Sequence, residues 1–247
     1  TDTMAYTSAM LSFMCMHVPI PVVFTGSQLS VAAPLTDAID NLRLAVTMAE
    51  SGKGGVYVAF NRRIILGCRT AKVRTVSFDA FESVNYSQVG TSNAFGLVLD
   101  EQALPAQNQA YRFMPSFNNR IAVIKYFPGM DADLFRYLME KEIAGFFLEG
   151  FGLGGVPFIK NSMLDEIEKA SMAGIPVLVG SQCRYEGSNL DVYETGKRVL
   201  ACGGIPVNDM TKEATVTKLM WALGQSSKRA DVQQMFQTNY IGEITLL

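Results

Sequence analysis

The chain opens with TDTMAYTSAMLSFMCM, residues 1–16, and this stretch decides how the rest of the sequence is interpreted. Two hydroxyls and a carboxylate come first, and the mainly apolar run that follows predicts a helix buried on most of its circumference. Asp2 or Thr3 is a good N-cap, because a short side-chain oxygen can accept hydrogen bonds from the free N–H groups of the first turn. The same groups, at the positive end of a buried helix, could instead hold a polar ligand. From these residues alone both interpretations stay open.

A short strand and a polar turn follow the helix. Residues 22–24, Val-Val-Phe, are typical of a buried parallel strand. Residues 25–28, Thr-Gly-Ser-Gln, lie at its carboxyl end, where open α/β sheets bind ligands. Ser27 is therefore a candidate wall of a pocket, although a plain turn explains it equally well.

The next helix begins after Thr36 and Asp37, which form a capping pair, and it runs to about Glu50. Its apolar positions indicate an inward face made of Ile39, Leu42, Leu44, Ala45 and Met48.

The rest of the chain predicts a two-domain α/β fold in which parallel sheets are flanked by helices. The sequence predicts strands at residues 56–60 and 64–67, and a hairpin in residues 78–118 followed by a linker at about 100–118. Strands are then expected at 121–124, 143–148 and 175–180. They alternate with helices that run from Asp131 to about Lys141, from Asn161 or Ser162 to Met172, and after Thr211. We place one domain at 1–115 and the other at 119–247.

Composition limits the possible functions of this 247-residue chain. Apolar residues make up 49% and charged residues 18%, which is typical of a globular protein. A net charge of -2, with both signs interspersed, argues against nucleic acid or an anionic membrane as a partner. The single histidine and the four dispersed cysteines argue against a metal site, and they favour a reduced, cytoplasmic setting. The glycine-rich loop at 150–155 lacks the spacing of a dinucleotide site, so no cofactor is expected.

The opening stretch closely resembles the second signature of bacterial-type L-asparaginases, which usually reads His-Gly-Thr-Asp-Thr before a helix of small and apolar residues. The likeness continues in order through PVVFTGSQ at 21–28, TD at 36–37 with NL at 41–42, FNRR at 60–63, RTAK at 69–72 and DMTKEATVTKL at 209–219. Several blocks in order are far more specific than one short motif. The resemblance is to type I-like, cytoplasmic members. It implies the asparaginase/glutaminase-like fold, a homodimer or homotetramer, and hydrolysis of L-asparagine to L-aspartate and ammonia.

The resemblance also implies a set of site residues. The Thr-Asp pair is catalytic in that family, which assigns catalytic roles to Thr1 and Asp2. The Arg-x-x-Lys context assigns the general-base role to Lys72, which composition alone would make a solvated surface charge. Thr1 would supply an activated hydroxyl, and Asp2 would orient Lys72 and bind the substrate's α-ammonium. The amine must lose its proton to act as a base, and burial beside other cations favours that loss.

The sequence departs from the family pattern before residue 1. The other family signature, a strand ending in Gly-Gly-Thr-Ile, does not occur here, so we expect an incomplete N-terminal domain whose second catalytic threonine lies upstream. Three other interpretations stay open. They are an asparaginase-like subunit of a glutamyl-tRNA amidotransferase, a catalytically incomplete fragment that binds a ligand, and a processed N-terminal nucleophile whose own α-amine is the base.

Overall fold

The computed structural model describes residues 1–159 and 162–245, and these form two compact units. The first unit contains Thr1–Pro115 and Tyr240–Glu243, and the second contains Ser116–Asn239 and Ile244–Leu247. Residues 240–243, which the sequence pattern places with the second domain, therefore group with the first unit. Their attachment is a hydrogen bond of 2.7 Å from the Arg69 Nε to the carbonyl of Gly242.

The first unit is built on a five-stranded sheet with the order β2-β3-β4-β7-β8. Its strands are β2 (Pro21–Phe24), β3 (Gly55–Phe60), β4 (Arg63–Leu66), β7 (Gly90–Asn93) and β8 (Gly96–Leu99). β2 and β3 are parallel, but the other neighbours are antiparallel. Between β3 and β4, Asn61 and Arg62 both have positive φ. Such a two-residue turn can only join antiparallel strands, and for this reason the sheet is mixed instead of parallel.

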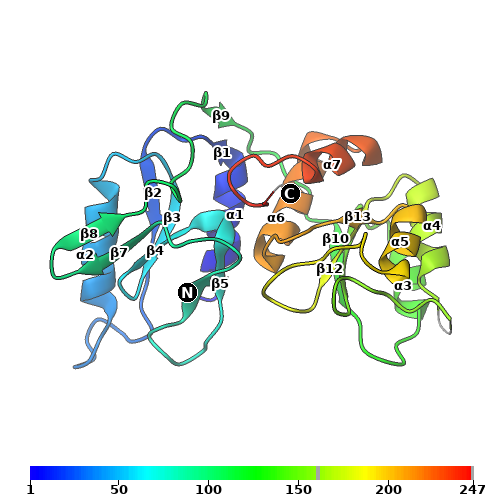
Figure 1. Ribbon diagram of the computed structural model, residues 1–247, viewed down its shortest axis with the longest axis horizontal. Helices are drawn as coiled ribbons and strands as arrows, with labels where there is room; N and C mark the ends of the chain where they lie inside the picture. Colours follow the sequence, from blue (N-terminus) through cyan, green and yellow to red (C-terminus); the bar gives the residue numbers. More distant parts are fainter. Residues whose placement is uncertain (160–161, 246–247) are drawn as a thin grey trace. The chain divides into compact units, whose positions relative to one another are not determined.

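Two helices, α1 (Met4–Met14) and α2 (Ala38–Ala49), cover opposite faces of this sheet (Figure 1). The alternation of side chains along β3 explains how the sheet serves both helices. Tyr57 and Ala59 pack in one core cluster with Leu44 of α2, whereas Val58 packs in the other cluster with Met4 of α1.

The buried face of α2 differs from the predicted one. Ile39 and Leu42, expected to point inward, are 41% and 54% exposed. Asn41 is buried instead, on the same face as Leu44 and Met48. The Asn41 amide donates to the carbonyl of Gly26, and its oxygen accepts from a backbone N–H, so the polar side chain is satisfied in the interior.

Two small sheets complete the first unit. β1 (Cys15–Met16) pairs with β9 (Arg112–Phe113), and β5 (Thr70–Lys72) pairs with β6 (Phe81–Ser83). A 3-10 turn, η1 (Gly67–Arg69), leads from β4 into β5. The region 78–118 thus contains four short strands, β6 to β9, as well as irregular chain.

The second unit has the parallel sheet that the sequence predicts. Its strands lie in the order β10 (Ile121–Lys125), β11 (Gly145–Gly150), β12 (Val177–Ser181) and β13 (Ile205–Pro206), and all neighbours are parallel. The helices are α3 (Asp133–Met139), α4 (Leu164–Met172), α5 (Glu194–Ala201), α6 (Lys212–Gln225) and α7 (Arg229–Phe236). Ser162 accepts from the N–H of Leu164 at the start of α4, and the alternative start, Asn161, lies outside the described residues. Thr211 caps α6 by accepting from the N–H of Ala214 at 2.9 Å.

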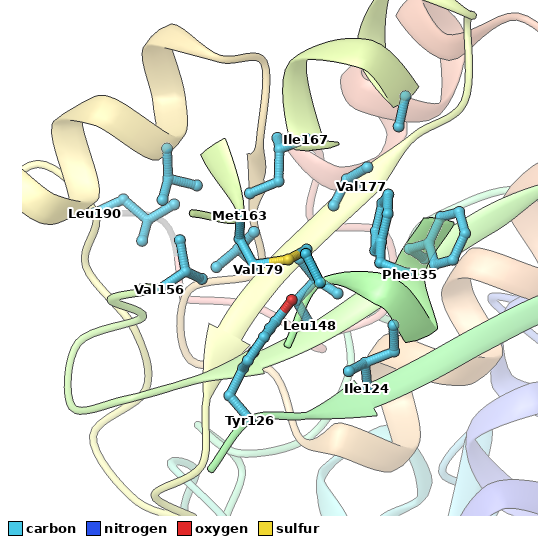
Figure 2. Packing of buried hydrophobic residues seen from close by; sticks show 14 residues of the cluster. Ile124, Tyr126, Phe135, Leu148, Val156, Met163, Ile167, Val177, Val179 and Leu190 are labelled. Carbon is cyan, nitrogen blue, oxygen red and sulfur yellow. The ribbon is translucent and has the colours of Figure 1, made fainter. Parts of the chain in front are cut away.

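The core of the second unit lies between the sheet and helices α3 to α5. Figure 2 shows Phe135 of α3 and Ile167 of α4 against Leu148 and Val179 of the strands. On the other face, α6 approaches so closely that a Cβ on Gly145 would lie 3.0 Å from Leu223. Within the described residues, no helix combines the length and the apolar character needed to cross a lipid bilayer.

Candidate functional site

The structure brings Thr1, Asp2 and Lys72 together. The Lys72 Nζ donates to the Thr1 Oγ1 at 2.9 Å and to the Asp2 Oδ1 at 2.6 Å. The Lys72 side chain is 19% exposed, whereas that of Asp2 is 92% exposed. A hydroxyl, an amine and a carboxylate thus lie within hydrogen-bonding distance in a site that faces solvent. Such a group can pass a proton between hydroxyl and amine while the carboxylate holds the amine in place.

Because η1 packs closely against α1, Lys72 lies near the start of that helix. The Ser8 hydroxyl donates to the carbonyl of Gly67 at 3.1 Å. A Cβ on Gly67 would lie only 3.0 Å from the Ser12 Oγ, so glycine permits this approach. β5 begins directly after η1 and ends at Lys72. The register of β5 on β6, in which Lys72 pairs with Phe81, then fixes the lysine backbone.

The segment before Lys72 is held by a buried arginine. Arg69 is 0% exposed, and its guanidinium lies 5.2 Å from the centre of the Tyr86 ring in addition to its hydrogen bond to Gly242. Arg74, on the other side of Lys72, forms ion pairs with Asp79 and Glu82. Cations were expected beside the lysine amine. The contacts that the structure describes for this amine are instead to a hydroxyl and a carboxylate.

Thr3, and not Asp2, occupies the N-cap position of α1, and neither its side chain nor that of Asp2 caps the first turn. The Thr3 carbonyl instead accepts from the hydroxyl of Thr7 at 2.9 Å. Asp2 is therefore available to Lys72, whose hydrogen bond and positive charge lower the pKa of the Asp2 carboxyl below its usual value. The carboxylate is thus ionised at neutral pH. The helix itself is less buried than expected, because Tyr6 is 42% exposed.

The turn after β2 lies beside Thr1. A Cβ on Gly26 would lie 3.1 Å from the Thr1 Cγ2, and the Thr25 hydroxyl ties this turn to β3 through the carbonyl of Ala59 at 2.8 Å. Ser27 belongs to the same turn, and its hydroxyl donates to the carbonyl of Leu29 at 2.7 Å. The Ser27 proton is therefore engaged inside the loop, and its oxygen remains able to accept.

Asp37 and Asn41 support this turn, a role that the sequence pattern did not indicate. The Asp37 carboxylate accepts from the backbone N–H groups of Gln28 and Leu29, and from the amide of Asn41 at 2.9 Å. The pattern predicted Asp37 only as part of a capping pair. An asparagine on the apolar face of a helix was the available signal, because a buried amide needs polar partners.

Among the described residues, no group of three or more histidine, cysteine or acidic side chains could hold a metal ion.

The two units match the N-terminal and C-terminal domains of one protein family. Residues 1–104 match the family Asparaginase, N-terminal, and residues 120–236 match the Glutaminase/Asparaginase C-terminal domain. An L-asparaginase of Thermococcus kodakarensis is 39% identical over 245 residues, which cover 99% of this chain and 74% of that protein. A glutamyl-tRNA(Gln) amidotransferase subunit of the same organism is 36% identical over 255 residues, which cover 99% of this chain but 57% of that protein.

Solved structures agree with the sequence comparisons. The thermostable L-asparaginase from Thermococcus kodakarensis superimposes with a TM-score of 0.95 over 100% of this chain and 74% of its own, at 39% identity. L-asparaginase I from Vibrio cholerae superimposes with a TM-score of 0.90 and 30% identity over the same shares of the two chains. The expected asparaginase/glutaminase-like fold is therefore confirmed, and the chain belongs to the asparaginase family.

Proposed function

We propose that the protein is an amidohydrolase that converts L-asparagine to L-aspartate and ammonia. The observation that carries this proposal is the position of the Lys72 Nζ, which lies within hydrogen-bonding distance of both the Thr1 Oγ1 and the Asp2 Oδ1. Membership of the asparaginase family supports the choice of a side-chain amide as the bond that is broken.

Thr1 provides the activated hydroxyl, and Lys72 provides its base. The reaction starts from the form of Lys72 that has given up one proton to solvent. The Thr1 hydroxyl then donates to this neutral amine, which takes the Oγ1 proton as the oxygen bonds to the amide carbon. The protonated amine then gives a proton to the leaving nitrogen, which departs as ammonia. Water hydrolyses the resulting ester to L-aspartate and restores the hydroxyl. The distance of 2.9 Å from amine to hydroxyl suits this transfer without a rearrangement.

Asp2 has two tasks in this scheme. One oxygen accepts from Lys72 at 2.6 Å and orients the amine. Because the Asp2 side chain is 92% exposed, the same carboxylate can also receive a cationic group from solvent. We assign to it the α-ammonium of the substrate. Ser27, in the turn beside Thr1, would accept a hydrogen bond from an N–H group of the bound amino acid, because its own proton is engaged by Leu29.

The test is ammonia release from L-asparagine by the wild type and by Thr1→Val, Asp2→Ala and Lys72→Met. We expect each substitution to lower kcat/KM by about 10²-fold or more, because each removes a group that takes part in proton transfer or substrate binding. Lys53→Met is the matched control, since Lys53 pairs with Glu101 at 3.0 Å and lies outside the site. Undiminished release in the three site variants would overturn the proposal.

A second candidate rests on the similarity to the glutamyl-tRNA(Gln) amidotransferase subunit. In this case the same groups would release ammonia from L-glutamine for use by a partner protein. Copurification with a large partner, and glutamine-dependent activity that requires tRNA, would favour this candidate over free asparagine hydrolysis. Calorimetric binding of L-aspartate without turnover of either amide would instead indicate a binding fragment.

A cytoplasmic location and assembly into a homodimer or homotetramer are further proposals that follow from the family. A solved relative titled probable cytoplasmic L-asparaginase, from Campylobacter jejuni, has a TM-score of 0.79 at 23% identity, and this supports the fold alone. Light scattering and cell fractionation test the two proposals.

A further inference from the structure

A groove of about 520 Å³ lies in the first unit between α2 and the β7–β8 hairpin. These elements lie side by side in Figure 1. Asp40, Arg43 and Thr47 of α2 line one side of the groove. Ser92 and Asn93 of the hairpin line another, and Arg62 of the β3–β4 turn completes it. The volume is in the range of pockets that hold small organic molecules. Its lining includes none of Thr1, Asp2 and Lys72.

Among the residues that the structure describes, Arg43 and Arg62 lack the close carboxylate partner that a neighbouring arginine has. Arg63, the next residue in the chain, pairs with Asp79 at 2.7 Å. Within the described residues, by contrast, no carboxylate lies within ion-pairing distance of Arg62. In the described part of the chain, the one carboxylate within ion-pairing distance of Arg43 is that of Asp40, at 3.8 Å, and these two side chains are 78% and 75% exposed. Asp40 also lines the groove, so two arginines there face one carboxylate. Exposed pairs of this kind contribute little, so the groove keeps a positive charge.

The backbone conformation of Arg62 is unusual for an arginine and suggests a function for its side chain. Its φ is +63°, in the second central position of a turn that strongly favours glycine. The Arg62 carbonyl accepts from the N–H of Ser92 at 2.8 Å, which fixes the turn against β7. An arginine in a left-handed conformation costs free energy that glycine would avoid, and such outliers gather at functional sites.

Uncharged groups in the groove can add hydrogen bonds to a bound anion. The Asn93 oxygen accepts from the N–H of Phe95 at 2.8 Å, so the Asn93 amide nitrogen is the end that can donate to a ligand. Leu44 and Leu97 supply apolar contact beside these polar groups.

We propose that this groove binds a small organic anion whose carboxylate or phosphate group is held by Arg43 and Arg62. Guanidinium groups bind both kinds of oxyanion through paired hydrogen bonds, and two guanidinium groups at one groove suit a ligand with two negative charges. The site is separate from the proposed amidohydrolase centre, so its existence does not depend on the activity.

Calorimetric titration with inorganic pyrophosphate and with succinate, at constant ionic strength, tests the proposal. We expect saturable binding of at least one probe, and the tighter probe identifies phosphate or carboxylate as the preferred group. Arg62→Gly and Arg43→Gln should each raise the Kd by about tenfold or more. Arg62→Gly is informative because glycine adopts the positive φ of this turn without strain. We therefore expect the variant to be folded and at least as thermally stable as the wild type, so that weaker binding reports the loss of the guanidinium.

Lys197→Gln is the matched control, because it removes one exposed positive charge from α5 of the second unit. An unchanged Kd in this variant supports a defined site. Absence of saturable binding by both probes would overturn the proposal, and so would equal weakening in Lys197→Gln and Arg62→Gly, which would indicate a general charge effect.

Discussion

Asp2 and Lys72 form a close ion pair even though the carboxylate is mostly in solvent. A hydrogen bond and the charge of Lys72 lower the pKa of Asp2, so the carboxylate stays ionised into mildly acidic solution. With the pKa lowered in the folded state, the pair is intact above the ordinary carboxyl range and is lost only as the pH falls through the folded-state pKa. The Asp2 carboxylate is therefore ionised across the neutral range, and it can accept a hydrogen bond from the Lys72 amine whether or not that amine is charged.

The pH profile of kcat/KM for asparagine should show the Asp2 carboxyl directly. We expect the wild type to keep its activity down to a pH below the usual carboxyl range and to lose it there. Asp2→Asn should lower kcat/KM by about 10²-fold and should lack this acid limb. If the acid limb is the same in both proteins, another group is responsible for it and the role of Asp2 is wrong.

Glu213, at the start of α6, is a buried carboxyl group. It is 9% exposed, and its Oε2 has no hydrogen-bond partner within the described part of the chain. Burial raises the pKa of this carboxyl, and the Glu149 carboxylate adds to the effect, while Arg184 and Lys212 oppose it. The folded state therefore holds the proton at pH values where the unfolded chain has lost it, and the free energy of unfolding falls as pH rises across that window.

Glu213→Gln should remove this dependence, because the amide does not titrate. We expect the variant to be more stable than the wild type by about 1 kcal/mol at the upper end of this pH window, where the wild type buries a carboxylate whose Oε2 has no hydrogen-bond partner among the described residues. Urea unfolding across the acid-to-neutral range gives the measurement, with the exposed Glu168→Gln as control. If the free energy of unfolding changes with pH in the same way in the wild type and in Glu213→Gln, Glu213 is not the group responsible.

At the scale of elements, the contact between α1 and η1 determines where Lys72 lies. Gly67 makes this contact possible, because it has no Cβ at the position closely surrounded by the Ser12 hydroxyl, the Ser8 carbonyl and a Val56 methyl group. Gly67→Ala would place a Cβ at 3.0 Å from the Ser12 Oγ and at 3.1 Å from the other two atoms. A methyl group in so tight a contact pushes η1 away from the helix and moves β5 with it.

We expect Gly67→Ala to lose about 1–3 kcal/mol of stability and to lose activity at temperatures where it is still folded. Gly155→Ala is the control, because its nearest neighbour, the Thr195 Oγ1, would be at an ordinary contact distance of 3.5 Å. Equal activity per folded molecule in the two variants would show that η1 does not position the lysine.

The elements also show what the sequence could and could not predict. The strands of the second unit and the Thr211 cap were predictable, since apolar runs and short capping side chains act locally. The orientation of α2 was not, because a helix with apolar residues on two adjacent stripes does not reveal which stripe faces the sheet. The buried stripe contains Asn41, whose partners are Asp37 at the start of the helix and backbone groups of two other loops.

Lys72 lies beside Thr1 and Asp2 because segments about seventy residues apart pack together. The spacing of apolar residues along the sequence does not predict such a long-range contact. Only the resemblance to a family suggested it. The support that Asp37 and Asn41 give to the turn beside Thr1 went unpredicted for the same reason.

At the scale of the whole chain, residues 240–243 belong to the first unit. Glu243 is 0% exposed, and its carboxylate accepts from the N–H groups of Tyr240 and Ile241, which shapes the loop that presents the Gly242 carbonyl to Arg69. Glu243→Ala should loosen this loop and lower the stability of the first unit by about 2 kcal/mol. Faster hydrogen exchange is expected in η1 and β5 and not in β11 of the second unit. Unchanged exchange in η1 and β5 would contradict this link.

The hydrogen bond between Arg69 and Gly242 joins residues 173 positions apart. During synthesis, residues 240–243 leave the ribosome after residues 116–239, which are contiguous and form a sheet of their own. The first unit is therefore completed only after the contiguous part of the second unit has emerged. Until residues 240–243 follow, the segment that carries Lys72 lacks the hydrogen bond from Arg69 to Gly242.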